Sequence, residues 1–270
     1  MAAKKISFAV NESKPGAVEA ERELRAAAVA AGLAVVDPAE ADVIVALGGD
    51  GTILHAARRF HGHALLGLNL GGLGFLASVE KRDFRRALGL LAAGRYKVSE
   101  RTLLALSRNG AERLALNDIV LRSSAGRAAV FDLSIDGAPA TRYHADGLVV
   151  ATPTGSTAYS LSAGGPVLMP DSRSFVVTPV CPHALGARPL VVPDTCRMTI
   201  ANRPRVDGEA QRVTACADGE ELFDLSADGQ VEICKARECA AFAELEGYNP
   251  YEVLSRKLGW RGSSLAEGAK

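Results

Sequence analysis

Residues 48–52 read Gly48-Gly49-Asp50-Gly51-Thr52, and the segments on either side of them decide the fold class. The apolar run 42–47 before this GGDGT motif is typical of a buried parallel strand, and residues 53–60 after it are typical of a helix. A glycine-rich loop between a strand and a helix leaves backbone N–H groups free at the carboxyl edge of a sheet, where open α/β folds bind phosphates. The motif therefore predicts an α/β domain with a loop that faces phosphate.

Asp50 is the unexpected residue of the motif. A carboxylate beside a phosphate is repelled unless it holds a metal ion or accepts a proton from an attacking hydroxyl. Phosphoryl transfer requires both of these roles. The alternative is that Asp50 only caps the following helix, since Asp is a favoured cap. A plain cap does not require glycine on both sides, so we interpret Asp50 as a catalytic group.

Composition limits the class of protein. The chain has 270 residues, 48% of them hydrophobic and 23% charged, which is enough for one large core or two smaller ones. Lys plus Arg and Asp plus Glu both number 31, so no positive field attracts nucleic acid or an anionic membrane. No apolar run is long enough to span a bilayer, and no signal peptide precedes the first predicted strand. We therefore expect a cytoplasmic protein without nucleic-acid or membrane partners.

The order of predicted elements indicates two domains. Strands and helices alternate as far as Gly94, as in an open, mostly parallel α/β sheet, and a mostly β region with hairpin-like dipeptides follows. Helical spacing returns at 251–258. We expect an α/β domain over 1–98 that carries the GGDGT motif, a β domain over 99–243, and a segment 244–262 that packs back on the first domain. The hairpin-like dipeptides are Asn109-Gly110, Asp136-Gly137, Asp207-Gly208, Asp218-Gly219 and Asp228-Gly229.

Three other stretches place polar or glycine residues where a core does not need them. Residues 71–77 read GGLGFLA after a predicted strand, and they either contact a ligand or form a turn that packs on its neighbour. Asn117-Asp118 interrupts an apolar strand, which indicates a ligand contact or, alternatively, a bulge or hairpin corner. The longest stretch, 146–166, runs from an apolar strand into hydroxyls and glycines ahead of a short helix near Thr157. Free N–H groups and hydroxyls at a helix start are typical of a second nucleotide-facing loop.

The sequence shows no set of metal ligands. The five cysteines are widely spaced in apolar surroundings and suit reduced core residues, and His61 and His63 have no acid nearby. The chain also contains no GxxxxGK[ST] sequence, which excludes a P-loop kinase.

Together with Pro179–Leu185 and Arg188-Pro189, these motifs resemble the NAD kinase family, in the family's order from about Ile6 to Trp260. The GGDGT motif alone is shared with lipid kinases and, with Ser for Thr, phosphofructokinases, whereas the 146–166 stretch is far more selective. The resemblance implies an enzyme that transfers the terminal phosphoryl group of ATP or polyphosphate to the 2′-hydroxyl of the adenosine ribose of NAD, giving NADP. It also implies Mg²⁺ as the divalent cation, a β-sandwich as the second, NAD-binding domain, and a homodimer or homotetramer.

The resemblance further implies roles for individual residues. Asp50 matches the family's catalytic proton acceptor. Two matching positions depart from the family pattern, because Glu is commoner at Asp118 and Gln is commoner at Glu220, where a carboxylate would add negative charge near a diphosphate. The residues that match substrate or nucleotide contacts are Gly51, Phe75, Asn117, Asp118, Arg127, His144, Asp146, Thr157, Ala158, Tyr159, Ser160, Leu161, Ser162 and Glu220.

Three other functions stay open at this point. A lipid or sugar kinase would share the GGDGT motif, and a non-catalytic NAD(P)-binding regulator would keep the pocket without turnover. A Rossmann dehydrogenase rests only on the spacing of Gly72, Gly74 and Ala77. None of the three explains the whole of 146–166.

Overall fold

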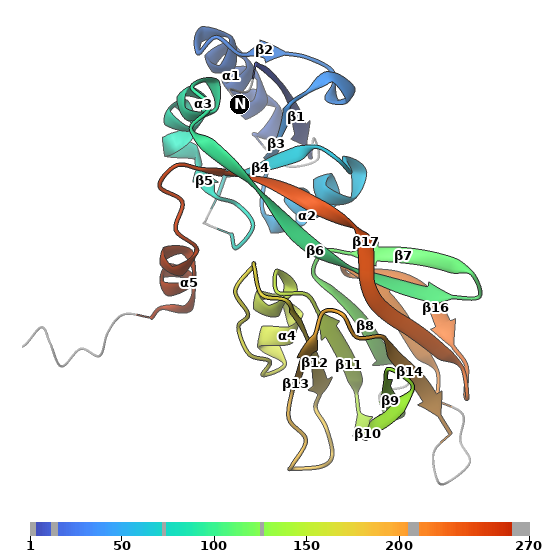
Figure 1. Ribbon diagram of the computed structural model, residues 1–270. Helices are drawn as coiled ribbons and strands as arrows, with labels where there is room; N and C mark the ends of the chain where they lie inside the picture. Colours follow the sequence, from blue (N-terminus) through green and yellow to red (C-terminus); the bar gives the residue numbers. More distant parts are fainter. Residues whose placement is uncertain (1–3, 12–15, 72–73, 125–126, 205–210, 261–270) are drawn as a thin grey trace, which may run out of the picture. The chain divides into compact units, whose positions relative to one another are not determined.

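The computed structural model divides the chain into two compact units, which Figure 1 colours along the sequence. The α/β unit comprises residues 1–100 and 240–270, and the β unit comprises residues 101–239. The chain passes from one to the other within two strands, β6 (Tyr96–Arg108) and β17 (Gln230–Leu245). From the sequence we expect these transitions at 98 and 243. The structure describes residues 4–11, 16–71, 74–124, 127–204 and 211–260.

A parallel sheet forms the centre of the α/β unit, as predicted. All five residues of its central strand β3 are buried, which explains why that strand is a continuous apolar run rather than an alternating one. A short strand, β5, and the end of β17 both pair with β4, also in parallel. The strands in spatial order are β2 (Ala34–Val35), β1 (Lys5–Val10), β3 (Val43–Leu47) and β4 (Ala64–Asn69), with β5 at Val79–Glu80.

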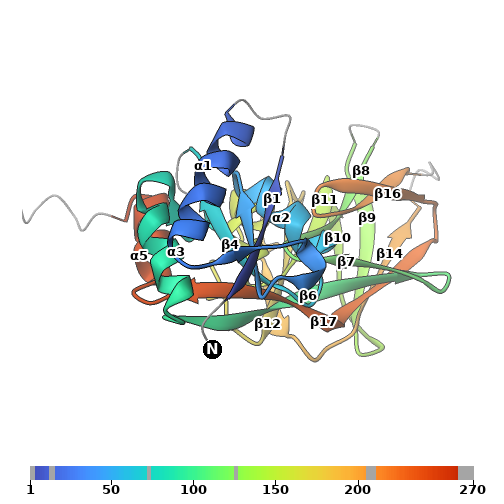
Figure 2. The same ribbon diagram turned by 90° about the horizontal axis from the view of Figure 1, so that it is seen from above.

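The helices of this unit follow the predicted apolar spacing. In α1, Ala20, Leu24 and Ala28 recur every four residues and are buried. Helices α1 and α3 lie side by side, whereas α2 packs on β3 and β4 (Figure 2). Among the described residues, no helix is long and apolar enough to cross a membrane. The elements are α1 (Ala17–Ala30), α2 (Asp50–Arg59) and α3 (Phe84–Ala92), with short 3-10 helices η1 (Pro38–Glu40) and η2 (Lys81–Asp83).

The last helix, α5 (Pro250–Leu258), belongs to the α/β unit, so the predicted return of the chain is confirmed. Its start is capped by the Asn249 side chain, which accepts a hydrogen bond from Tyr251 N at 3.0 Å. Pro250 occupies the first turn, and Gly259, with a φ of 65°, ends the helix in the left-handed conformation.

The β unit is an antiparallel sandwich. One sheet has the order β13-β12-β11-β8-β15-β16, and the other contains β10-β9-β14-β17, with β6 and β7 paired as a hairpin. The strands not yet given are β7 (Ala111–Ala115), β8 (Asp118–Ser123), β9 (Ala129–Ile135), β10 (Ala138–Ala145), β11 (Gly147–Ala151), β12 (Ser174–Val180), β13 (Leu190–Pro193), β14 (Met198–Arg203), β15 (Val213–Ala217) and β16 (Glu220–Leu225).

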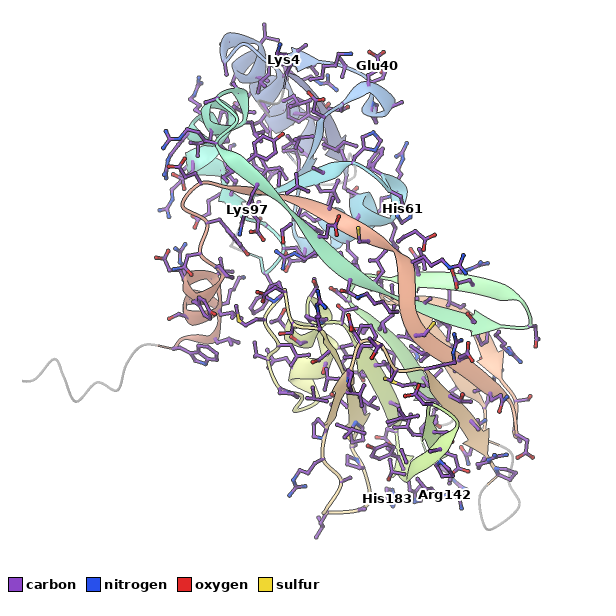
Figure 3. All side chains as sticks on the ribbon, viewed as in Figure 1. Lys4, Glu40, His61, Lys97, Arg142 and His183 are labelled. Atoms are coloured by element: carbon purple, nitrogen blue, oxygen red, sulfur yellow. The ribbon has the colours of Figure 1, made fainter. Side chains whose placement is uncertain are left out.

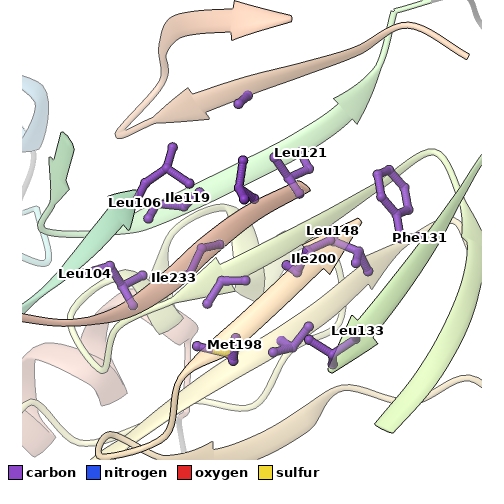
Figure 4. Packing of buried hydrophobic residues seen from close by; sticks show 14 of the residues in the cluster. Leu104, Leu106, Ile119, Leu121, Phe131, Leu133, Leu148, Met198, Ile200 and Ile233 are labelled. Atoms are coloured by element: carbon purple, nitrogen blue, oxygen red, sulfur yellow. The ribbon is translucent and has the colours of Figure 1, made fainter. Parts of the chain in front are cut away.

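The core of the sandwich is filled from both sheets (Figure 4). Leu121 and Leu148 come from the six-stranded sheet, and Phe131 and Ile200 come from the other. Along β9, Phe131 and Leu133 are buried while the residue between them is half-buried, which is the alternation expected of a strand with one face in a core.

Three of the predicted hairpin turns are confirmed. Asn109, Asp136 and Asp218 have φ values of 50°, 50° and 49°, and the glycine after each also has a positive φ. Two consecutive positive φ values define the type I′ turn that matches the twist of paired strands. Asp207-Gly208 lies outside the described residues. At 228–229 only Asp228 has a positive φ, so that dipeptide does not form the same turn.

The outer face of the six-stranded sheet is covered as well. No residue of β11 is exposed, and Val149 and Ala151 on its outer face belong to a small apolar cluster on which Leu168 packs. Leu168 belongs to the connection from β11 to β12, which also contains η3 (Gly155–Thr157) and α4 (Tyr159–Ser162). The hydroxyl-rich stretch is therefore anchored on buried structure.

Candidate functional site

The GGDGT motif forms the turn from β3 into α2. Gly48 has a φ of 151°, and a Cβ there would lie 2.4 Å from Thr52 Oγ1, so only glycine fits. Gly49 is the extended N-cap residue, and α2 begins at Asp50 rather than after Thr52, which corrects the predicted helix start. Gly51 is exposed, and a Cβ there would meet no atom of the described residues within 4 Å. Glycine destabilises a helix by about 1 kcal/mol relative to alanine, and no described neighbour requires glycine at position 51. The missing side chain leaves the first turn of α2 open to a ligand.

The Asp50 carboxylate points to the loop between β4 and β5. Its Oδ2 accepts a hydrogen bond from Phe75 N at 2.8 Å, and its Oδ1 accepts one from Leu76 N at 3.0 Å. The N-cap is Gly49, which has no side chain, so the alternative that Asp50 caps α2 is wrong. Two backbone donors fix the carboxylate in one orientation.

Residues 74–76 of the glycine-rich stretch lie against this carboxylate. A Cβ on Gly74 would lie 1.9 Å from Asp50 Oδ1, so this position must be glycine for the loop to approach. The tight turn that packs on its neighbour is therefore present at Gly74. Residues 72–73, which complete the dinucleotide-like spacing, lie outside the described residues.

Thr52 adds an unsatisfied polar group beside the same turn. Its side chain is only 9% exposed, and its Oγ1 has no hydrogen-bond partner within the described chain. A buried hydroxyl without a partner costs about 1–3 kcal/mol, which a ligand or a water molecule bound at the turn would relieve.

A cavity of about 750 Å³ opens beside the GGDGT motif within the α/β unit. It lies where β1 ends and α2 begins, which is the edge at which open α/β sheets bind ligands. Sequence reasoning missed its basic residues, although His55 and Arg59 stand four apart on the helix after the motif and so share a face. Its lining includes Phe8, Val10, Asn11, Arg25, Gly51, Thr52, His55, Arg59 and Phe60.

The lining of this cavity includes Arg25, Arg59 and Glu21. Arg25 Nη2 pairs with Glu21 at 2.7 Å, so that charge is balanced locally. The Arg59 guanidinium lies 5.1 Å from the centre of the Phe60 ring, and His55 is exposed. An anionic ligand with an apolar part fits such a lining, because the cations attract charge and the aromatic rings offer apolar contact.

In the β unit, Asn117 lies at a corner and not inside one strand, which corrects the sequence prediction. Strand β7 ends at Ala115 and β8 begins at Asp118, but β7 pairs with β6 whereas β8 pairs with β11 and β15, so the corner joins the two sheets and is not the hairpin corner of the alternative. The corner is fixed by the Asp218 carboxylate, which accepts hydrogen bonds from Leu116 N, Asn117 N and Asp118 N at 2.9, 2.7 and 3.2 Å. Sequence reasoning assigned Asp218 only to a turn, and a turn dipeptide carries no signal of this second role.

Asp118 is a buried acid beside another acid. Its side chain is 5% exposed, and its backbone N–H donates to the Asp218 carboxylate. Burial and then the negative charge of Asp218 raise the pKa of the Asp118 carboxyl to about 7. Asp118 therefore changes charge near neutral pH, unlike an ordinary aspartate.

The hydroxyl-rich stretch is tied to this corner. Thr152 Oγ1 donates to Leu116 O at 2.6 Å and accepts from Gly155 N at 3.0 Å. A Cβ on Gly155 would lie 1.9 Å from Asn117 O, so glycine is required for this contact. The structure thus brings together two stretches that the sequence predicted separately.

The predicted contact residues 157–162 differ in exposure. Ser160 is fully buried, and its hydroxyl lies 2.8 Å from that of Thr178, so it supports the fold of the loop. Tyr159 and Ser162 are exposed, while Thr157, Ala158 and Leu161 are half-buried. The accessible side of the loop is formed by these five residues.

The other predicted contacts of the β unit are more scattered. Asp146 is exposed at the junction of β10 and β11, and Arg127 and Glu220 are exposed as well. The His144 ring lies 4.1 Å from that of His183, which Figure 3 labels, and His144 Nε2 is buried without a partner among the described residues. The predicted residues therefore form two groups: Asp50, Gly51 and Phe75 in the α/β unit, and all the others in the β unit.

No group of three or more His, Cys, Asp or Glu side chains that could hold a metal ion occurs in the part of the chain that the structure describes.

Comparisons with known proteins agree with the geometry in both units. The ATP-NAD kinase N-terminal domain matches residues 8–96, and the ATP-NAD kinase C-terminal domain matches residues 116–245. The NAD kinase of Azoarcus sp. is 42% identical over 228 residues, covering 82% of this chain and 76% of that protein. The chain belongs to the NAD kinase family. The NAD kinase of Symbiobacterium thermophilum is 38% identical over 282 residues, covering 94% and 98% of the two chains.

Solved structures of the family share the fold. Yeast NADH kinase complexed with NADH superposes with a TM-score of 0.85 at 25% identity, covering 96% of this chain and 88% of that one. The NAD kinase of Archaeoglobus fulgidus in complex with ATP has a TM-score of 0.75 at 24% identity, covering 94% and 96%. Membership in the NAD kinase family makes the chain a phosphotransferase and sets aside the dehydrogenase alternative.

The fit of Gly74 against Asp50 gives a first prediction. Gly74→Ala should push the carboxylate away from Phe75 N and Leu76 N and cost about 1–3 kcal/mol of unfolding free energy. Gly71→Ala is the matched control, because among the described residues a Cβ there meets only Asn69 Oδ1, at 3.8 Å. Urea unfolding of the three proteins measures the difference. Equal losses in both variants would show that the carboxylate does not depend on the close approach.

The buried acid gives a second prediction. Between about pH 4 and about pH 7 the folded protein holds a proton on Asp118 that the unfolded chain has released, so this group makes stability fall as pH rises. Asp118→Asn removes that contribution, so the unfolding free energy of the variant minus that of wild type should rise by about 1.4 kcal/mol per pH unit across this range and level off above it. Denaturant titrations at several pH values test this. A difference that is constant with pH would contradict the raised pKa.

Proposed function

We propose that the chain is an NAD kinase, which transfers the terminal phosphoryl group of ATP or polyphosphate to the 2′-hydroxyl of the adenosine ribose of NAD and gives NADP. The observation that carries the proposal is the Asp50 carboxylate, fixed by two backbone N–H groups at the open start of α2. Family membership supports the same reaction.

Asp50 acts as the proton acceptor in this proposal. A ribose hydroxyl is a weak nucleophile at neutral pH, and a carboxylate placed against it takes up its proton as the new O–P bond forms. Each Asp50 oxygen uses one acceptor direction for a backbone N–H and keeps another for the substrate. Because the carboxylate is already oriented, little reorganisation is needed when the hydroxyl arrives.

The start of α2 receives the transferring phosphate. The N-terminal end of the helix attracts anions, and the lack of a side chain at Gly51 allows a phosphate to approach the backbone there. Mg²⁺ would be held by an Asp50 oxygen together with the donor phosphates, since Mg²⁺ generally takes one or two carboxylates plus phosphate oxygens. When bound, it would neutralise the charge that develops on those phosphates.

We assign NAD recognition to the 116–118 corner and the loop it holds. An Asn side chain suits the edge of an adenine, and a carboxylate suits the paired hydroxyls of a ribose, which are the roles proposed for Asn117 and Asp118. The accessible residues Thr157, Ala158, Tyr159, Leu161 and Ser162 would wrap the adenosine, and the buried Ser160 would support them from beneath. The further proposed contacts are Phe75, Arg127, His144, Asp146 and Glu220.

The donor is assigned to the basic cavity of about 750 Å³ in the α/β unit. Arg59 and His55 would bind the distal phosphates, and the Phe8 and Phe60 rings offer apolar contact to a base. Polyphosphate, which has no base, would contact Arg59 and His55 but not the aromatic rings. The same cavity thus accommodates either donor named above.

We also propose that the protein is a cytoplasmic homodimer or homotetramer. Leu185 is 94% exposed and Val191 is 46% exposed, and large apolar side chains left open to water are common at subunit contacts. Sedimentation equilibrium of the purified protein distinguishes a monomer from these assemblies.

Turnover with NAD, ATP and Mg²⁺, read as NADP by a dehydrogenase that requires it, tests the proposal. Asp50→Asn should keep the fold and NAD binding but lower kcat by about 10³-fold or more, because proton acceptance is lost. Asp42→Asn is the matched control, since the Asp42 carboxylate also accepts two backbone N–H groups, from Lys4 and Lys5, at the opposite end of β3. Near-normal turnover by Asp50→Asn would show that Asp50 is not the base. A folded wild type that binds NAD and forms no NADP would favour a non-catalytic regulator.

The donor assignment makes a separate prediction. Arg59→Ala should raise the KM for ATP about tenfold or more, because a charge-assisted hydrogen bond to phosphate is lost, and should leave the KM for NAD unchanged. Arg22→Ala, at an exposed arginine of α1 outside the cavity lining, serves as the control. Steady-state kinetics with each substrate varied in turn provide the measurement. Equal effects on both KM values would place the donor elsewhere.

A further inference from the structure

The loop that holds the Asp50 carboxylate is itself held by α5. Phe75 donates its N–H to Asp50, and its ring lies 5.9 Å from Lys257 Nζ. Five residues later, Glu80 Oε1 accepts a hydrogen bond from Arg256 Nη1 at 2.9 Å. Arg256 and Lys257 are neighbours in the last turn of α5, so one helix turn reaches both ends of the segment 75–80.

Helix α5 is stabilised by caps at both ends and by one buried side chain. It has only nine residues, and isolated helices of that length are marginal in water, so its order depends on caps and packing. Asn249 and Gly259 cap its two ends, and Leu254 is buried. The basic residues of its last turn also match the negative end of the helix dipole. Figure 1 labels α5 as the last helix of the chain.

The segment 75–80 has other anchors of its own. Ser78 N donates to Gly67 O at 3.1 Å, and Val79 and Glu80 pair with β4 as strand β5. These bonds fix the second half of the segment. The first half, which carries the two N–H groups that face Asp50, begins directly after Gly74 and has the Lys257 contact on its Phe75 ring.

We infer that α5 is a positioning element for the Asp50 carboxylate and that Arg256 and Lys257 act through the segment 75–80. The two side chains hold the segment, and the segment's N–H groups hold the carboxylate. The inference rests on the proposed function of Asp50 as the proton acceptor. Arg256 and Lys257 are positioning residues, and contact with substrate or donor is not needed for this role.

The test uses the full chain with the double variant Arg256→Ala/Lys257→Ala. Both contacts are exposed, so we expect kcat to fall about fivefold, with the KM for NAD unchanged. Arg82→Ala is the matched control, because Arg82 Nη2 also pairs with Glu80, at 3.1 Å, yet lies beside it in the sequence and makes no link to α5. The conservative variant Arg256→Lys/Lys257→Arg keeps both charges and should restore kcat.

Amide hydrogen exchange gives a readout that does not depend on activity. Exchange at Phe75 and Leu76 should become faster in the alanine double variant and stay unchanged in Arg82→Ala, with equal melting temperatures showing that the fold is intact. Unchanged exchange and unchanged kcat in the double variant, or an equal loss of kcat in Arg82→Ala, would overturn the inference. If wild type forms no NADP, the proposed function fails, while the exchange experiment still decides whether α5 orders the loop.

Discussion

The arrangement of the candidate site in the α/β unit depends on one interaction, the pair of hydrogen bonds from Phe75 N and Leu76 N to the Asp50 carboxylate. It joins two loops that follow neighbouring strands, β3 and β4, and it requires glycine at 74 because a side chain there would occupy the place of the carboxylate oxygen. The bonds turn Asp50 away from its own helix. The start of α2 is thereby left free for phosphate, and the acid stands beside it with its orientation already set.

In the β unit, too, a carboxylate fixes a connecting segment by accepting hydrogen bonds from its backbone N–H groups. The Asp218 carboxylate accepts three backbone N–H groups and so fixes the corner of Asn117 and Asp118, on which the hydroxyl-rich loop is then anchored through Thr152 and Gly155. In each unit the carboxylate holds backbone that lies between two strands, at residues 75–76 in the α/β unit and 116–117 in the β unit. The consequence differs, because Asp218 also raises the pKa of Asp118 to about 7, whereas Asp50 stands beside an open helix start.

Much of the fold could be predicted from the sequence, because apolar periodicity and turn dipeptides are local signals. The buried run of β3, the type I′ turns at Asn109, Asp136 and Asp218, and the return of α5 all follow from such patterns. The two carboxylate anchors could not be predicted. They join residues 25 and about 100 positions apart, and neither an Asp in a GGDGT motif nor an Asp in a turn reveals which backbone it will meet. The roles of individual contact residues stay predictions, and the burial of Ser160 shows that a hydroxyl in a nucleotide-like stretch also serves the loop's own structure.

We propose above all that Asp50 accepts the proton of the ribose hydroxyl while two backbone N–H groups of the loop fix the orientation of its carboxylate. The most direct measurement is a crystal structure of the protein with NAD and a non-hydrolysable ATP analogue. The account predicts the 2′-hydroxyl of the adenosine ribose at about 2.6–3.2 Å from an Asp50 oxygen, with the bonds from Phe75 N and Leu76 N still in place. A bound NAD whose 2′-hydroxyl meets another side chain, with Asp50 turned away from it, would contradict the account.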